Sequence, residues 1–324
     1  MGERPTLRTA EAPRVEAGNH ARAGNAARIT RLMTRASIAS VSVASILLVI
    51  KAVAWLMTDS VALLSSLVDS LLDVVASALN FVAVRQALTP ADAEHRFGHG
   101  KAEAIAGLGQ SAIIAGSAAF LLFESSVRLI HPQSIEKTPV GIAVMGLAIL
   151  LTLALVFYQR HVVRYTGSVA IRADSLHFKS DLLVNAGVIV ALVLASTFGI
   201  ERADPAFAMV IALYVARTAW QIWRTSIDMV MDRELPDEER ARIRDIVRAH
   251  PEVVDIHDLR TRSAGTRTFI QFHIELPTDC SLVHAHAVSD QVEARIAQAF
   301  PDAEIIIHAD PYGIQEARAD FGDD

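Results

Sequence analysis

The sequence predicts a membrane protein of the all-α class, with six transmembrane helices followed by a small cytoplasmic α+β domain. Its composition is 52% hydrophobic and 20% charged, which is more apolar than an ordinary soluble protein. Six apolar segments before Asp232 each approach the length of about 20 residues that crosses a bilayer. After Asp232 the pattern changes to amphipathic helices and short alternating strands, which predicts a separate soluble unit.

The six predicted spans differ in how closely they match an uninterrupted apolar segment of membrane-crossing length. Lys51 interrupts the first span near its end, where we expect its ammonium to snorkel to the lipid head groups. Arg217 makes the sixth span the weakest, although Trp220 and Trp223 suit an interfacial aromatic belt at its end. The spans cover residues 33–57, 60–84, 104–127, 140–158, 169–198 and 206–223.

Basic residues are distributed unevenly between the loops on the two sides of the membrane, and this bias sets orientation. The richer side holds Arg31, Arg35, Arg85, Arg96, Lys101, Arg160, Arg164, Arg172, Arg224 and Arg233, and the poorer side holds Arg128, Lys137 and Arg202. Both termini are therefore predicted to be cytoplasmic. Residues 1–30 are rich in Arg, Ala, Glu and Pro, and they predict a disordered cytoplasmic tail rather than a cleaved signal peptide.

The soluble unit predicts elements in the order α-β-β-α-β, as in a ferredoxin-like or metallochaperone-like domain. The two helices are expected at residues 235–250 and 281–300, and the three strands at 253–263, 266–276 and 303–311. The apolar face of the second helix comprises Leu282, Ala285, Val288, Val292 and Ile296. We therefore divide the chain into a tail (1–30), a six-helix transmembrane domain (31–232), a cytoplasmic domain (233–315) and an acidic tail (316–324).

Two of the apolar spans carry ionisable residues at helical spacing. Asp69 and Asp73 lie in the second span, and His177 and Asp181 lie in the fifth. The i, i+4 spacing puts both members of each pair on one helix face. Ionisable side chains inside a membrane are costly and by default mark an ion pathway. Three carboxylates and one imidazole suit Zn²⁺, Fe²⁺, Co²⁺ or Cd²⁺ better than Mg²⁺ or Ca²⁺, so these four residues predict a transition-metal site without fixing the ion.

The alternative is that these four groups only form hydrogen bonds between helices. Their depth argues against this alternative. Asp73 is 12 residues from Arg85, which corresponds to about 18 Å along a helix. His177 and Asp181 lie about two to three turns into the fifth span, which runs in the opposite direction. The two pairs can therefore meet near the middle of the membrane.

The loop after the second span, PADAEHRFGHGK, contains a further candidate metal site. Asp92, His95 and His99 could converge on one ion, because Gly98 and Gly100 allow the backbone to turn. The same residues are equally compatible with a solvated polar loop. The spacing does not decide between the two interpretations.

Histidines are also concentrated in the soluble domain. Strand alternation places His273 on the polar face of its strand, and it places His308 and Asp310 on a common face. His257 ends the apolar part of the first strand, and His284 and His286 open the second helix. These residues predict surface metal binding, with scattered exposed histidines as the alternative.

These features together resemble the cation diffusion facilitator family, most closely its bacterial zinc and ferrous-iron efflux members. The resemblance rests on six spans, DSLLD in the second span, HFKSD in the fifth and a C-terminal α+β module. It extends from residue 31 to residue 315. It also includes, in order, DAEHRFGHGKAE, MDRELPDEER, HDLRTR, QFHIEL, HAHAVSDQVE and IIHADP.

The resemblance implies a homodimeric metal/proton antiporter of the bacterial inner membrane, which exports Zn²⁺ and also Fe²⁺ or Cd²⁺ by alternating access. It also implies a transport site, a loop site, a cytoplasmic binuclear site bridged by Asp310, and a charge pair that locks the protomers together. The implied transport site comprises Asp69, Asp73, His177 and Asp181, and the loop site comprises Asp92, His95 and His99. The cytoplasmic binuclear site comprises His257, His273, His286, His308 and Asp310. The charge pair is Lys101 with Asp232. His284 has no role in this pattern.

Other classes of function fit the sequence less well. A membrane-bound metal sensor needs no site at mid-membrane. An intramembrane metalloenzyme is disfavoured because the sequence lacks HExxH and has no Glu beside either pair to serve as a general base. A net charge of −6 gives no basic excess for nucleic acid, and a single cysteine, Cys280, rules out a disulfide framework. We therefore predict a transporter and not an enzyme.

Overall fold

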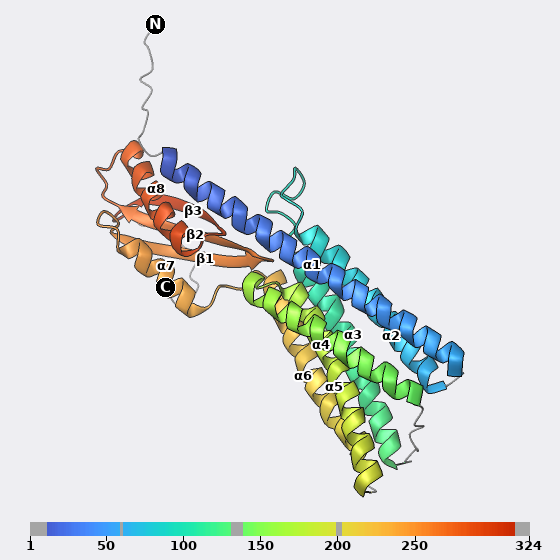
Figure 1. The fold of residues 1–324 in the computed structure, drawn as a ribbon. Helices are drawn as coiled ribbons and strands as arrows, with labels where there is room; N and C mark the ends of the chain where they lie inside the picture. Colours follow the sequence, from blue (N-terminus) through green and yellow to red (C-terminus); the bar gives the residue numbers. More distant parts are fainter. Residues whose placement is uncertain (1–11, 59–60, 131–138, 199–202, 315–324) are drawn as a thin grey trace.

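A bundle of six long helices and a smaller α+β domain lie at opposite ends of the molecule (Figure 1). The structure is a computed structural model, and it describes residues 12–58, 61–130, 139–198 and 203–314. The bundle consists of α1 (Ala12–Thr58), α2 (Val61–Ala87), α3 (Ala102–Ile130), α4 (Pro139–Thr166), α5 (Val169–Phe198) and α6 (Ala203–Val230). The predicted fold class is therefore confirmed.

The bundle has the surface of a membrane domain. Within the described ranges, five helices are long and apolar enough to cross a membrane by length and composition. The sixth, α5, is 30 residues long and packs against α3, α4 and α6. Large apolar side chains lie on the outside of the bundle, where Leu56, Phe120 and Val210 are 74%, 68% and 67% exposed. Such a surface suits lipid, because lipid removes the cost of exposing apolar groups to water.

Small residues let the helices approach closely at points where the core is polar. A Cβ atom added to Gly107 of α3 would lie 2.2 Å from Ser226 Oγ of α6, so a larger residue there would have to displace this serine side chain. Ser40 of α1 donates a hydrogen bond to Ser77 of α2 over 3.1 Å in a buried position. The bundle is thus held by close backbone packing and interhelical hydrogen bonds.

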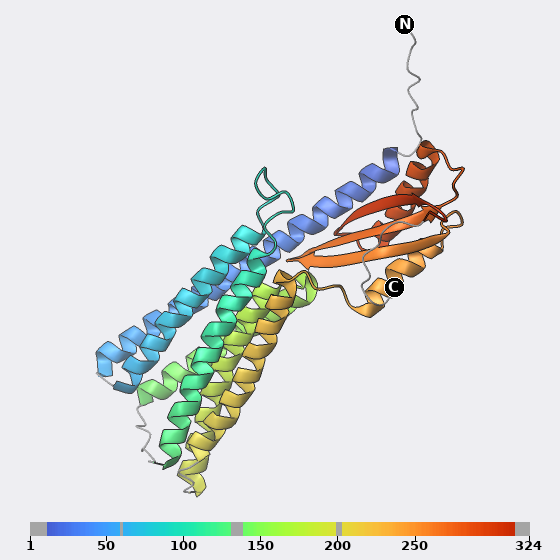
Figure 2. The ribbon, with the colours of Figure 1, turned by 180° about the vertical axis from the view of Figure 1, so that it is seen from behind.

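The first helix begins earlier than predicted. Residues 12–30, which we expected to be a disordered tail, are helical and continuous with the first span. This stretch is rich in Ala and Arg, which have high helix propensity. The extension runs beside the C-terminal domain (Figure 2). Asn25 donates a hydrogen bond to Asp302 over 3.2 Å and accepts one from the Tyr165 hydroxyl over 3.0 Å, so it contacts both the domain and the end of α4.

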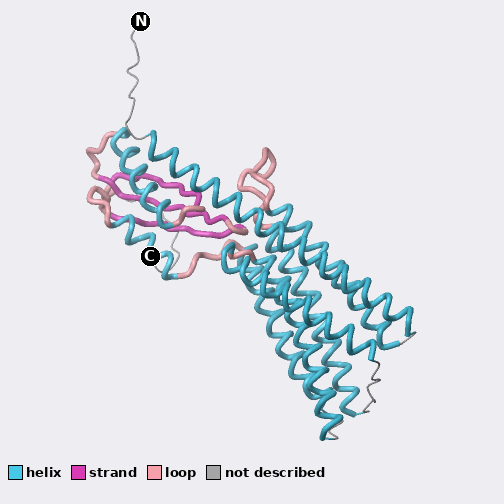
Figure 3. The backbone as a smooth tube through the Cα atoms, viewed as in Figure 1, coloured by secondary structure: helices cyan, strands magenta, loops and turns pink. Residues whose placement is uncertain are grey.

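The C-terminal domain contains every strand of the described chain (Figure 3). Its elements are α7 (Asp237–Arg248), β1 (Asp255–Ala264), β2 (Arg267–Leu276), α8 (Leu282–Ala299) and β3 (Ala303–Pro311), which confirms the predicted α-β-β-α-β order. The sheet order is β1-β2-β3, with β1 and β2 antiparallel and β2 and β3 parallel.

One face of this sheet packs on the two helices. In β2, Ile270, Phe272, Ile274 and Leu276 are buried, and they share a core with α7 and α8. The residues that alternate with them, including His273, point to the opposite face. Leu282, expected on the buried face of α8, is 87% exposed because it opens the helix beyond the core. The alternation leaves one sheet face free for polar side chains.

The turn between β1 and β2 contacts the start of α3. A Cβ atom added to Gly100 would lie 2.1 Å from the carbonyl oxygen of Ala264. The turn itself needs a glycine, since Gly265 has a φ of +64°. This contact joins the sheet directly to the membrane domain.

Candidate metal sites

The bundle brings together three of the four ionisable residues predicted for its interior. Nε2 of His177 lies 3.1 Å from Oδ1 of Asp73 and 3.8 Å from Oδ2 of Asp181. One ligand atom from each residue lies within 4.8 Å of the others, which is compatible with a shared metal ion. Asp73 comes from α2, whereas His177 and Asp181 occupy one face of α5 through their i, i+4 spacing.

The burial of this group suits a metal ion. His177 is only 5% exposed. Oδ2 of Asp181 is a buried atom that has no hydrogen-bond partner among the described residues. A buried carboxylate oxygen without a partner is costly, and a bound cation would satisfy it. The donor set of two carboxylates and one imidazole is also one that zinc and related ions accept.

Asp69 lies outside this group of three. It lies on α2 one turn from Asp73, and it is exposed on the surface of the helix bundle. It is still close enough to Asp73 for the charges of the two carboxylates to interact. The structure therefore leaves one of the four predicted ligands next to the group and not within it.

Two residues near this group were missed or misplaced by sequence reasoning. Asp174 is fully buried on α5 and accepts a hydrogen bond from Nε2 of Gln159 over 2.6 Å. Its i−3 spacing from His177 was the signal that could have identified it. Lys51 does not snorkel outward as predicted: its ammonium points to α2, because the Ser66 carbonyl and the Ser70 hydroxyl offer it two acceptors.

The loop between α2 and α3 draws its three predicted residues together. Oδ1 and Oδ2 of Asp92 lie 3.4 Å from His95 Nδ1 and from His99 Nε2, respectively. Oδ1 of Asp92 also accepts hydrogen bonds from the backbone N–H groups of His95 and Glu94. These bonds, that of His95 first, hold the pKa of Asp92 below its ordinary value. Nδ1 of His99 is buried without a hydrogen-bond partner in the described chain, so this loop also fits a metal ion.

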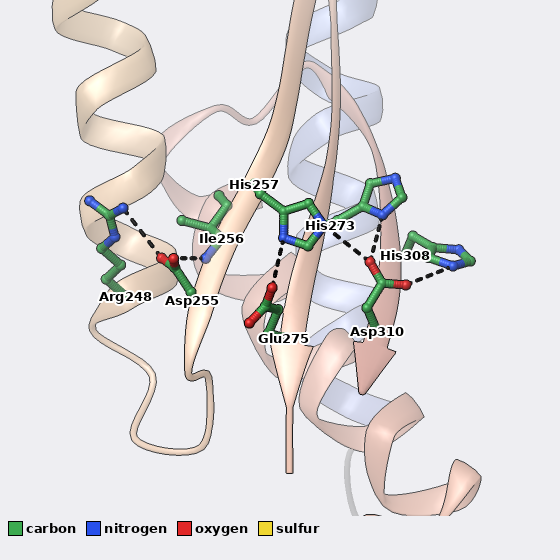
Figure 4. A network of polar contacts seen from close by, with 8 residues as sticks. All are labelled: Arg248, Asp255, Ile256, His257, His273, Glu275, His308 and Asp310. Carbon is green, nitrogen blue, oxygen red and sulfur yellow. Dashed lines mark hydrogen bonds and ion pairs between the residues drawn. The ribbon is translucent and has the colours of Figure 1, made fainter. Parts of the chain in front are cut away.

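The sheet of the C-terminal domain aligns three histidines in one row (Figure 4). His257 of β1 pairs with His273 of β2, which in turn pairs with His308 of β3. Asp310 is the common partner: Oδ2 lies 2.8 Å from His273 and 3.2 Å from His257, and Oδ1 lies 3.0 Å from His308. Strand register, which fixes which residues lie side by side, thus creates the cluster.

The electrostatics of this cluster favour the carboxylate. Partial burial alone would raise the pKa of Asp310. The hydrogen bond from His273 and the charges of His273, His308 and His257 outweigh burial and bring the pKa below its ordinary value. The carboxylate is therefore ionised at neutral pH and ready to bind a cation.

A strand irregularity adds a residue that we did not predict. The β1–β2 register shifts between His257 and Arg260, and Asp258 has a φ of 50°. Asp258 thereby has a ligand atom within 4.8 Å of those of His257 and His273. Simple alternation would have sent its side chain to the other face, so the sequence pattern gave no sign of it.

His286 does not join this cluster within one chain. It lies on α8, where its side chain is 76% exposed and 3.6 Å from Asp290. His284 is bound elsewhere, with Nε2 2.5 Å from Oε2 of Glu252. Of the five residues predicted for this site, the chain therefore assembles four.

The predicted charge pair forms within a single chain. Nζ of Lys101 lies 3.0 Å from Oδ2 of Asp232, and it also donates to the Val230 carbonyl over 3.3 Å. Arg262 approaches Oδ1 of Asp232 at 3.4 Å. Partial burial would raise the pKa of Asp232, but the hydrogen bond and charge of Lys101, followed by those of Arg262, lower it. These contacts tie the start of α3 to the end of α6 and to β1.

Comparison with known proteins gives consistent matches over most of the chain. Residues 37–231 match the family model of the cation efflux transmembrane domain, and residues 235–312 match that of the cation efflux protein, cytoplasmic domain. The cation-efflux pump FieF of Shewanella oneidensis is 48% identical over 280 residues, which are 86% of this chain and 94% of that protein. FieF of Klebsiella pneumoniae subsp. pneumoniae is 47% identical over 287 residues, 89% of this chain and 95% of that protein. A solved structure of CzrB is 40% identical and covers 24% of this chain and 99% of its own, with a TM-score of 0.24.

Proposed function

This chain belongs to the cation efflux family of membrane transporters, and we propose that it exports a divalent transition-metal ion from the cytoplasm in exchange for protons. The observation that carries this proposal is the buried group of Asp73, His177 and Asp181 between two bundle helices. Ionisable residues at this depth are costly unless they serve an ion pathway. We propose a transport function and not an enzymatic one.

We assign Asp69 as the fourth ligand of the transport site. It lies one helical turn from Asp73, close enough for the charges of the two carboxylates to interact. A change of its rotamer or a small rotation of α2 would bring its carboxylate to the ion. The cargo is Zn²⁺ first, with Fe²⁺ and Cd²⁺ as further ions, because a mixed carboxylate and imidazole set suits these metals.

Exchange with protons follows from the chemistry of the ligands. Metal binding requires deprotonated carboxylates and a neutral imidazole, so binding releases protons and protonation releases metal. His177 is the ligand that would exchange protons near neutral pH. Because the ligands lie on two helices, α2 and α5, relative movement of these helices would expose the site to one side at a time.

The loop and sheet groups are proposed as additional metal sites. Asp92, His95 and His99 would bind an ion near the cytoplasmic entrance. The cluster around Asp310 would bind regulatory Zn²⁺ as a binuclear site. His286 would join that site only after α8 moves or a second copy approaches, since it lies apart in one chain.

The proposed assembly is a homodimer in the bacterial inner membrane, with both termini in the cytoplasm. The match to the cytoplasmic domain of cation efflux proteins supports the location of the C-terminal domain. The excess of basic residues in the loops on that side supports the same orientation. We propose that Lys101 and Asp232, which pair in one chain, also hold the two protomers together near the membrane surface.

The test is uptake of Zn²⁺ by sealed vesicles that contain the purified protein and carry an imposed pH gradient. We expect Asp73→Ala to abolish uptake that depends on the gradient, because it removes one of the three gathered ligands. Asp237→Ala is the matched control, since this carboxylate lies on α7 outside the bundle and is 93% exposed. Full uptake by Asp73→Ala would reject the transport site. Metal binding without any flux in the wild type would instead indicate a sensor.

A further inference from the structure

Lys51 is a half-buried cation of α1 whose role the proposed exchange does not explain. Its ammonium donates to Oγ of Ser70 over 2.7 Å and to the carbonyl oxygen of Ser66 over 3.2 Å. Ser70 is 1% exposed and lies in α2 between Asp69 and Asp73. The cation is therefore fixed to the same stretch of α2 that provides the proposed transport ligands.

The partners of Lys51 are unusual for a charge in the membrane. Both acceptors are neutral oxygens, so no carboxylate of the described residues forms a hydrogen bond with the ammonium. That charge acts at longer range on Asp73, Asp181 and Asp69. A lysine in this environment costs free energy, and a hydroxyl and a carbonyl return little of it. Such a cost points to a function for the charge itself.

We propose that Lys51 is a positioning residue whose fixed positive charge weakens the hold of the transport site on its divalent ion. This proposal rests on the proposed function of Asp73, His177 and Asp181. A nearby cation repels the metal ion and also stabilises the empty carboxylates, and both effects lower metal affinity. A transport site must release its ion in every cycle, so binding has to stay weak enough for departure.

A purely structural role would predict the opposite sign. If Lys51 only ties α1 to α2, its loss loosens α2, displaces Asp73 and weakens metal binding. If its charge tunes the site, its loss strengthens metal binding and slows release. The direction of the change in apparent affinity therefore separates the two roles.

The experiment measures the KM and the maximal rate of Zn²⁺ uptake in vesicles for the full-length protein. For Lys51→Met we expect the KM to fall about tenfold, equivalent to about 1.4 kcal/mol, together with a lower maximal rate. Lys51→Arg keeps the charge and should behave like the wild type. Lys179→Met is the matched control, because Lys179 lies on α5 between His177 and Asp181 but donates to the Tyr214 hydroxyl over 2.7 Å.

Direct binding gives an independent reading. Calorimetric titration with Cd²⁺ in a background of Asp92→Ala and Asp310→Ala removes key ligands of the other two sites. There Lys51→Met should bind about tenfold more tightly. If Lys51→Met does not fold, Lys51→Gln replaces it, since the amide keeps a hydrogen bond without the charge.

A KM or a dissociation constant that is unchanged or raised in the neutral variants would overturn the role of Lys51. This outcome is distinct from failure of the transport proposal. The latter would appear as undiminished uptake by Asp73→Ala, whatever the behaviour of the Lys51 variants.

Discussion

The bundle and the sheet each gather carboxylate and imidazole groups, but they do so on scaffolds of different stiffness. In the bundle, Asp73 stands on α2, and its partners His177 and Asp181 stand on α5. Packing and side-chain hydrogen bonds, and no backbone hydrogen bonds of a shared sheet, set the distance between two such helices. In the sheet, His257, His273 and His308 occupy three strands that are joined by backbone hydrogen bonds.

This difference teaches what each group can do. Two helices can slide or rock against each other, so a site shared between them can open and close. A row of residues in hydrogen-bonded strands cannot change its spacing without breaking the register. We therefore interpret the bundle group as an exchangeable transport site and the sheet group as a stable binding site.

The largest expected effect comes from removing one ligand from each site in turn and measuring both Zn²⁺ uptake and Zn²⁺-dependent stability. His177→Ala should lower Zn²⁺ uptake by at least the roughly 10–100-fold that is typical when a residue supporting a metal ligand is lost, because it removes the central ligand itself. Asp310→Ala should retain most uptake at saturating metal. It should instead lose the part of the Zn²⁺-dependent rise in stability that the sheet site contributes, about 2.7 kcal/mol at 100 times that site's dissociation constant.

His161→Ala is the control for both measurements, because this histidine is exposed on α4 outside either group. The distinction between a transport site in the bundle and a stable binding site in the sheet would be wrong if Asp310→Ala abolished uptake as completely as His177→Ala. It would also be wrong if His177→Ala transported normally.

Hydropathy and periodicity were sufficient for the fold class, and the family identified from the sequence motifs is confirmed. Hydropathy and periodicity were insufficient where the same local sequence is compatible with two conformations. The snorkelling rule does not say whether Lys51 turns to lipid head groups or to a neighbouring helix. Composition suggested disorder before residue 30, whereas high helix propensity and continuity with the span produced a helix from Ala12.

The sites show the same division. The i, i+4 rule brought His177 and Asp181 to one face, but it could not fix the rotation of α2 that leaves Asp69 outside the group. In the sheet, alternation placed each histidine on a face, while the row itself depends on strand register, which a sequence without a partner strand does not specify. Asp258 could not be predicted, because a shift of register carries it into the cluster.

An intermediate effect is expected where the two regions touch. Gly100→Ala would push a methyl group against the Ala264 carbonyl, which is 2.1 Å from the added Cβ position. We expect the free energy of unfolding to fall by about 1–3 kcal/mol, as for other overpacked contacts, with a lower rate of uptake. Thermal unfolding and vesicle flux measure both effects.

Gly109→Ala, within α3 shortly after Gly100, is the control, because a Cβ there meets nothing within 4 Å. Equal behaviour of the two variants would mean that the contact between the turn and α3 has no bearing on stability or transport. The sheet and the bundle would then act as separate units.

The smallest expected effect concerns the charge pair at the same junction. The pKa of Asp232 is lowered in the folded chain, so the pair contributes stability above the ordinary carboxyl pKa of about 3.9. This contribution disappears as the pH falls through the lowered pKa. At pH 7, Asp232→Asn should therefore cost less than about 1 kcal/mol, because the pair is partly exposed, and the difference from wild type should shrink below about pH 4. Asp279→Asn, in the exposed turn before α8, provides the comparison at each pH. A cost that stays constant from pH 7 to pH 3 would show that the side chain of Asp232 acts through packing and not through its charge.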